Sequence, residues 1–326
     1  MQYWDIVKRS FAISWRHRYL WLLALFAGES GGASLNYTQS QPIQTSGTGK
    51  PPDFNGAAQQ VSSWVTQNLD GILILSGLLA VLFIVLFVLG AICEGALVRA
   101  SAEHDAERPF DLAVAWRCGR STMGTIIRFR LLLLLLGLPV LIALGALAIG
   151  AVAALLGHNI GAGISLIVGG VLLLLATIPY AIYLSFLNRL GTRAAILEQL
   201  AARTSMVRAH RLLLKRLGRV LLVWLTSIVV GIVVGIVFAI VLASIGIPLF
   251  IAGAAAYASG SGAVWLVAGL GVVVFLPVAL VVGSFISAQD STFWTVAFRR
   301  LEFDQAPAAY AHPNPSAPPT PGAPAS

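Results

Sequence analysis

The chain has 326 residues, of which 58% are hydrophobic and 10% are charged, whereas soluble domains usually carry about 25% charged residues. A water-soluble fold of this length could not bury so much apolar surface, so we expect the lipid bilayer to be its solvent. The net charge of +8 would suggest nucleic acid in a soluble protein. Here the basic residues flank apolar segments, so we expect anionic lipid headgroups and no nucleic acid as partners.

The N-terminal segment predicts an amphipathic helix over residues 3–18, with two tryptophans on its apolar face. The apolar run at 19–28 follows, and ten helical residues rise only about 15 Å, half of a bilayer core. Either the helix continues through small residues to about 36 and crosses the membrane, or 19–28 re-enters from the same side. Charge counting, given below, favours the crossing at 19–36.

Five further runs with almost no charged residues predict membrane spans. They lie at about 71–93, 131–156, 161–187, 220–247 and 263–288. Polar residues at about 37–70 predict an extracytoplasmic loop, and uncharged loops are expected at 157–160 and 248–262. Residues 1–305 would thus form a six-helix membrane domain, followed at 306–326 by a disordered, cytoplasmic tail rich in Pro and Ala.

The segments between spans are strongly basic. The segment at 94–130 holds six arginines and is broken by Pro109, so a second helix should begin near Asp111. In the segment at 188–219, a basic amphipathic helix is expected to run directly into the span at 220–247. Its basic stripe is predicted to contact lipid headgroups through Arg208, Arg211, Lys215 and Arg219. A last interfacial helix is expected at 289–302.

The distribution of Lys and Arg predicts how the chain is threaded. Of the 21 Lys and Arg residues, only Lys50 falls outside alternate segments of the six-span map. The positive-inside rule then places the N- and C-termini in the cytoplasm. The fold class is therefore all-α, a polytopic transmembrane helical bundle of six spans with basic interfacial helices. Three similar units, beginning near residues 4, 111 and 205, suggest a parallel repeat, and the composition suggests a multi-pass protein of a bacterial plasma membrane.

Small residues recur every four positions in the span at 220–247, at Gly231, Gly235 and Ala239. This spacing lets helix backbones approach closely. We expect the stripe to pack against another span of the chain or against a second copy.

The middle of each of the five predicted spans from residue 71 onward lacks Asp, Glu, His, Lys and Arg. Membrane enzymes need such groups to move protons or hold a metal, so we expect no enzymatic activity and no cofactor. The candidates at the span edges are Glu94, Arg99, His158 and His210. Glu94 and Arg99 are expected to pair, and Glu103–Glu107 to form a solvated turn rather than a metal site.

Two functions are compatible with this pattern. The first is a non-enzymatic scaffold or lipid-contacting module, with membrane lipids and a membrane-protein partner or second copy as its contacts. The alternative is a transporter of an apolar or lipid-like solute without ion coupling, because a coupled carrier normally shows an intramembrane carboxylate. A cavity lined by Tyr180, Tyr183, Thr226 and Ser227 would favour the transporter.

Three motifs resemble a known group of membrane proteins. They are WRHRYLWLL at 15–23, EGALVR at 94–99 and STFWTVAFRRL at 291–301. Together they resemble uncharacterised bacterial six-helix membrane proteins, similar to the membrane domain attached to some glycerophosphoryl diester phosphodiesterases. The resemblance spans residues 1 to about 305 and implies the membrane architecture alone. His17-Arg18 is followed by Tyr19 instead of the glycine of that enzyme's His-Arg-Gly motif, so no catalytic residue is carried over.

Overall fold

The computed structural model describes residues 3–27, 63–157, 159–260 and 262–302, and within these ranges it is helical, without strands. The helices are α1 (Tyr3–Arg16), α2 (Tyr19–Ala27), α4 (Leu69–Asp105), α5 (Leu112–Leu156), α6 (Ile160–Leu197), α7 (Ala202–Lys215), α8 (Leu217–Ala258) and α9 (Ala263–Glu302). The predicted all-α fold class is thus confirmed for the described chain.

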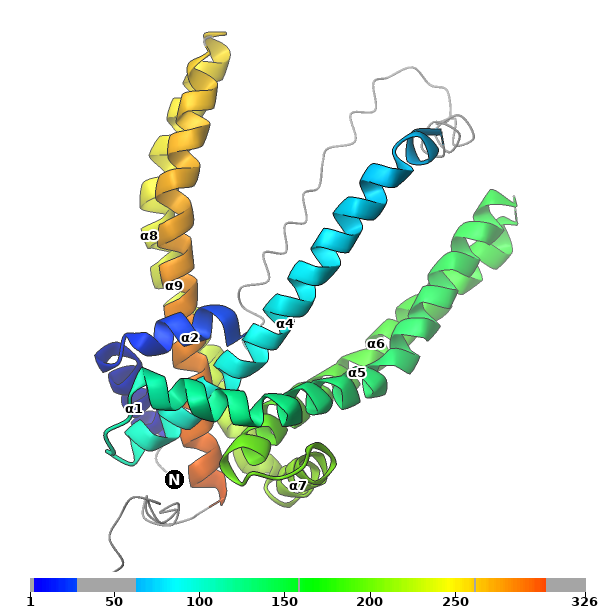
Figure 1. The fold of residues 1–326 in the computed structure, drawn as a ribbon. Coiled ribbons are helices and arrows are strands. Elements are labelled where there is room, and N and C mark those ends of the chain that lie inside the picture. The colour runs from blue at the N-terminus through cyan, green and yellow to red at the C-terminus, as the bar shows by residue number, and fades with distance from the viewer. Residues whose placement is uncertain (1–2, 28–62, 158, 261, 303–326) are drawn as a thin grey trace, which may run out of the picture.

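Three apolar arms leave a common base on one side of the molecule (Figure 1). The arms are the N-terminal part of α4, the α5–α6 hairpin and the α8–α9 hairpin. The base consists of α1, α2 and α7 together with the basic ends of the long helices. These ends are 90–105 of α4, 112–130 of α5, 186–197 of α6, 217–224 of α8 and 284–302 of α9. Almost all buried side chains lie in the base.

The arms indicate a multi-pass membrane protein. Five described helices are long and apolar enough to cross a membrane, and at most 6% of the most apolar window in each is buried. Large side chains such as Ile74, Phe83 and Ile149 are mostly exposed. An apolar surface of this extent is stable against lipid and not against water.

The C-terminal half of α9 forms the centre of the base, where it packs on α1, α2, α4 and α6. Trp294 and Phe298 are fully buried there. The predicted interfacial helix at 289–302 was therefore wrong, because α9 continues through it without a break. Its polar side chains tolerate burial since their hydroxyls bond within the helix, as Thr295 does to the Ser291 carbonyl at 2.8 Å.

One predicted boundary is confirmed, and two other expectations about helix limits are wrong. The helix start near Asp111 is correct, because Asp111 is the N-cap of α5. The loop expected at 248–262 is instead mostly helix, since α8 continues through Pro248 to Ala258. In an apolar stretch a helix satisfies the backbone groups, at the loss of one hydrogen bond at the proline. The expected continuity of α7 into α8 is broken at Arg216, where φ is −130°.

The first predicted span, at 19–36, is described only in part. Its first nine residues form α2, which rises about 13.5 Å and packs on α4 and α9 at the base. Leu20, Leu23 and Ala27 are buried in those contacts. Residues 28–36, most of the expected loop at 37–70 and the expected tail at 306–326 lie outside the described residues.

The close helix contacts fall on glycines other than those predicted. Gly231, Gly235 and Ala239 are exposed, and a Cβ added to either glycine would meet nothing within 4 Å. In the base, by contrast, a Cβ on Gly119 of α5 would lie 2.2 Å from the Ile92 carbonyl oxygen of α4. The contact of α4 with α5 therefore depends on Gly119. Gly231 and Gly235 on α8 make no close contact with another helix of the described chain, so for them the predicted contact with a second copy is the one that stays a prediction.

A methyl group at Gly119 should separate α4 from α5. We expect Gly119→Ala to lower the free energy of unfolding by about 1–3 kcal/mol, the usual effect of overpacking. Thermal unfolding of the purified protein in detergent measures this, with Gly235→Ala as the matched control in an exposed helix. Equal melting temperatures for the two variants would contradict the close contact.

Candidate functional site

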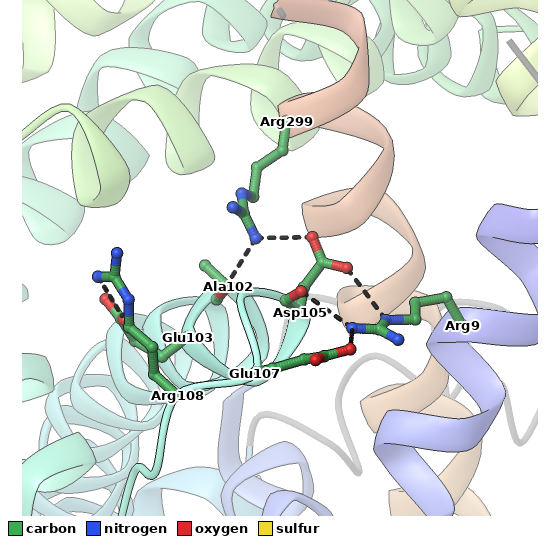
Figure 2. A network of polar contacts seen from close by, with 7 residues as sticks. All are labelled: Arg9, Ala102, Glu103, Asp105, Glu107, Arg108 and Arg299. Atoms are coloured by element: carbon green, nitrogen blue, oxygen red, sulfur yellow. Dashed lines mark hydrogen bonds and ion pairs between the residues drawn. The ribbon is translucent and has the colours of Figure 1, made fainter. Parts of the chain in front are cut away.

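Asp105, at the C-terminal end of α4, joins the first and last described helices (Figure 2). Arg299 of α9 donates to an Asp105 carboxylate oxygen at 2.6 Å and to the Ala102 carbonyl at 2.8 Å. Arg9 of α1 lies 3.5 Å from the other carboxylate oxygen and donates to Glu107 at 2.8 Å. The Arg299 and Asp105 side chains are only 5% and 9% exposed. This carboxylate therefore fixes three chain segments to one another.

The predicted solvated turn at 103–107 was wrong for most of its length. His104 and Asp105 are buried, because the end of α4 is covered by α1 and α9. Glu103 is paired with Arg108 at 3.3 Å, in the loop that follows. Within the described ranges no group of three His, Cys, Asp or Glu side chains could hold a metal ion.

A second buried carboxylate, Glu94, holds α4 against α5. Glu94 is 2% exposed and pairs with Arg130, not with Arg99 as predicted. Arg99 is paired with Glu103 at 2.9 Å, one helical turn further on. The Arg130 guanidinium also donates to the Ala27 carbonyl at 2.9 Å, at the end of α2. Arg130 thus links three helices, and its carboxylate partner Glu94 is 36 residues away in sequence.

Asp290 on α9 makes the corresponding contact with α6 and α8. Arg189 of α6 donates to Asp290 at 2.8 Å, and Ser227 of α8 donates to the other carboxylate oxygen at 3.3 Å. The Arg189 guanidinium also lies over the Trp294 ring, 4.8 Å from its centroid, as in a cation–π contact.

Two carboxylates share one arginine where α7 joins the base. Arg208 of α7 pairs with Glu302 at the end of α9 and lies 3.4 Å from Glu198 at the end of α6. Burial raises the pKa of Glu198 to about 7, and the hydrogen bond and charge of Glu302 act in the same direction. Arg216 donates to the Leu301 carbonyl. The middle and the C-terminal end of α7 are thereby attached to α9.

The predicted headgroup-contact residues fall into two groups. Arg208 is half exposed but engaged in the ion pairs above. Arg211, Lys215 and Arg219 are exposed on the surface of α7 and the start of α8. Lipid contact by these three side chains stays a prediction.

The histidines at the base make contacts within the protein. His210, a candidate from the sequence, shares a 2.8 Å hydrogen bond with the hydroxyl of Tyr183. His17 and His104 stack, with ring centroids 3.6 Å apart. Partial burial and the nearby Arg16 charge lower the pKa of His17, so at neutral pH its ring is uncharged in this stack. The remaining candidate, His158, lies outside the described residues.

Six acidic side chains of the base pair with arginines, and all but Glu103 link different helices in this way. Glu94, Glu103, Asp105, Glu198, Asp290 and Glu302 each pair with an arginine. Removal of one partner from a buried pair destabilises the joined form, because the other charge is left buried and unpaired.

A family model matches residues 11–296, from α1 to the buried part of α9. The chain belongs to the family of unknown function DUF7544. No curated protein and no solved structure matches it. The region shared with the DUF7544 family contains Glu94, Asp105 and Asp290, whereas Arg9, Arg299 and Glu302 lie just outside it.

Loss of the Asp105 carboxylate should leave the buried Arg299 without its counter-charge. We expect Asp105→Ala to destabilise the protein by about 3–5 kcal/mol. Chemical unfolding in detergent measures the change. Glu107→Ala is the matched control, since Glu107 also pairs with Arg9 but is 77% exposed, and should cost about 1 kcal/mol or less.

The pH dependence of α7 attachment follows from Glu198. A carboxyl whose pKa rises from the ordinary 4.5 to about 7 on folding stabilises the fold at acidic pH, and this contribution is lost as pH rises through 7. Between pH 6 and 8 we expect the wild type to lose about 1 kcal/mol relative to Glu198→Gln. Thermal unfolding across this range measures the difference. The same pH slope in both proteins would contradict it.

Proposed function

We propose that this protein is a non-enzymatic scaffold of a bacterial plasma membrane, whose base contacts lipid headgroups on the cytoplasmic side. One observation carries the proposal, the separation of an ion-paired, buried base from arms with almost no buried surface. Lipid can cover the arms, while headgroups and water suit the charged rim of the base.

The arrangement of helix ends supports six crossings with both termini in the cytoplasm. Helix α1 and the C-terminal end of α9 both lie at the base, and each described hairpin begins and ends there (Figure 1). The α5–α6 and α8–α9 hairpins account for four crossings and α4 for a fifth. The sixth crossing of the proposal is the span predicted at 19–36, of which the residues beyond Ala27 lie outside the described chain.

The basic surface of the base supports contact with anionic headgroups. Arg211 and Lys215 lie one turn apart on α7, Arg219 lies at the start of α8 beyond the break at Arg216, and all three are exposed. A basic surface at the junction with apolar helices is attracted to anionic lipids, by about 1 kcal/mol for each residue near the membrane. Headgroup contact would hold the base level with one membrane face.

The alternative, a carrier of an apolar solute, has less support. Two hydroxyls expected to line its cavity bond within the protein, Tyr180 to the Leu136 carbonyl at 2.9 Å and Ser227 to Asp290 at 3.3 Å. A membrane-protein partner or a second copy remains part of the proposal, with the exposed face of Gly231 and Gly235 as its expected contact.

Cysteine labelling tests the orientation. In a variant lacking Cys93 and Cys118, Ser259→Cys at the α8–α9 turn should react in intact cells with a membrane-impermeant maleimide. Lys215→Cys, which is also exposed, should react only after permeabilisation. Labelling of Lys215→Cys in intact cells would overturn the orientation.

The same preparation distinguishes scaffold from carrier. Reconstituted into vesicles, the protein should leave the transbilayer movement of a fluorescent phospholipid at the protein-free rate. Movement that scales with the amount of protein would favour the carrier.

A further inference from the structure

A groove of about 520 Å³ lies between α2 and the first turns of α5. Its lining residues are Leu22, Leu23, Leu112, Ala113, Trp116, Arg117 and Arg120. Leu23 is fully buried, whereas Leu22 and Trp116 are 58% and 40% exposed. The groove is thus bounded by apolar side chains and carries two guanidinium groups at one end of its α5 wall.

The α5 wall is a single helical face. Leu112, Trp116 and Arg120 are spaced four residues apart, and Ala113 and Arg117 occupy the neighbouring row. The face therefore changes from apolar to basic along the helix axis, over about 12 Å for residues 112–120. A ligand that contacts the whole face must have an apolar part and an anionic part.

The two arginines of the groove are not among the seven that pair with described carboxylates. In the described chain, ion pairs with carboxylates occupy Arg9, Arg99, Arg108, Arg130, Arg189, Arg208 and Arg299. Arg117 and Arg120 are exposed and have no ion pair with any described carboxylate. Their charge is consequently available to an anion from outside the chain.

The chemistry of the groove matches a phospholipid. Guanidinium groups bind phosphate through two parallel hydrogen bonds, and two of them on one helix face supply a doubly basic site. An indole that is partly exposed beside them suits the headgroup level of a membrane. The volume is in the usual range of about 300–1,000 Å³ for small-molecule sites, which accommodates a headgroup and the first part of an acyl chain.

We propose that the α2–α5 groove binds one anionic phospholipid, with its phosphate at Arg117 and Arg120 and its acyl part against Leu22, Leu112 and Trp116. This rests on the proposed function, which puts the base at the cytoplasmic headgroups. It adds a defined site and a lipid class to that function. Net positive charge alone would attract anionic lipids to any basic surface, whereas a groove site retains one lipid at one place.

Native mass spectrometry of the full chain tests the site. The protein is inserted into nanodiscs of phosphatidylcholine, or of an equimolar mixture with phosphatidylglycerol, and the lipid retained on release is counted. From the mixture the wild type should retain one phosphatidylglycerol, preferred at least roughly tenfold over phosphatidylcholine, as expected for two charge-assisted contacts. The variant Arg117→Gln/Arg120→Gln should lose this preference, with an unchanged melting temperature.

The matched control is Arg211→Gln/Lys215→Gln, which removes the same charge from exposed positions on α7 and should keep the retained lipid. Leu112→Asn tests the apolar wall and should weaken retention without changing the charge. Equal loss in the groove variant and the α7 control would overturn the site in favour of diffuse attraction. Displacement of the lipid by millimolar inorganic phosphate would overturn it in favour of a phosphate site.

The outcomes separate this inference from the proposed function. A wild type that inserts into nanodiscs but retains both lipids equally would overturn the groove site alone. A protein that does not insert, or that inserts with its base facing the cell exterior, would overturn the proposed function as well.

Discussion

The carboxylate of Asp105, shared between guanidinium groups of α1 and α9, is the contact on which the base depends. It is nearly buried, as is the Arg299 guanidinium, whereas Arg9 is partly exposed and has Glu107 as a second carboxylate partner. Other carboxylate–arginine pairs join further helices of the base in the same way. They are Glu94 with Arg130, Asp290 with Arg189, and Glu302 with Arg208. The helices are consequently joined at one end by charge pairs, of which the pair of Arg299 with Asp105 is nearly buried on both sides and the others are partly exposed.

Outside the base, little attraction holds the helices of different arms together. Lipid tails are as apolar as leucine, so the hydrophobic effect does not drive one bare apolar helix against another in a bilayer. Side chains of the arms are accordingly exposed, and most close backbone approaches are in the base, as at Gly95 and Gly119. The base sets which arms are neighbours, and lipid or another protein must fill the space between them.

Sequence reasoning succeeded where a local pattern has one physical meaning. An uncharged run of more than twenty residues is readable as a membrane-length helix, and Asp111 after Pro109 marks a helix start. It failed where a pattern has two meanings. The periodicity of 289–302 is the same for a surface helix and for a buried one, and the partner of Glu94 is 36 residues away at Arg130. Gly231 and Gly235 have the spacing of a packed helix face and are nevertheless exposed. Spacing alone could not show that the close contact between helices is at Gly119.

The contact of Arg189 with Asp290 gives the α6 and α9 arms a common starting level. From Arg189, α6 rises about 44 Å to Ile160, and from Asp290, α9 rises about 41 Å to Ala263. Both arms are longer than the roughly 30 Å of bilayer hydrocarbon. Tyr257 and Trp265 are exposed near the tip of the α8–α9 hairpin, and such aromatic side chains favour the interface. Hydrophobic mismatch would therefore tilt the hairpins until this aromatic pair meets the opposite leaflet's surface, or thicken the bilayer around them.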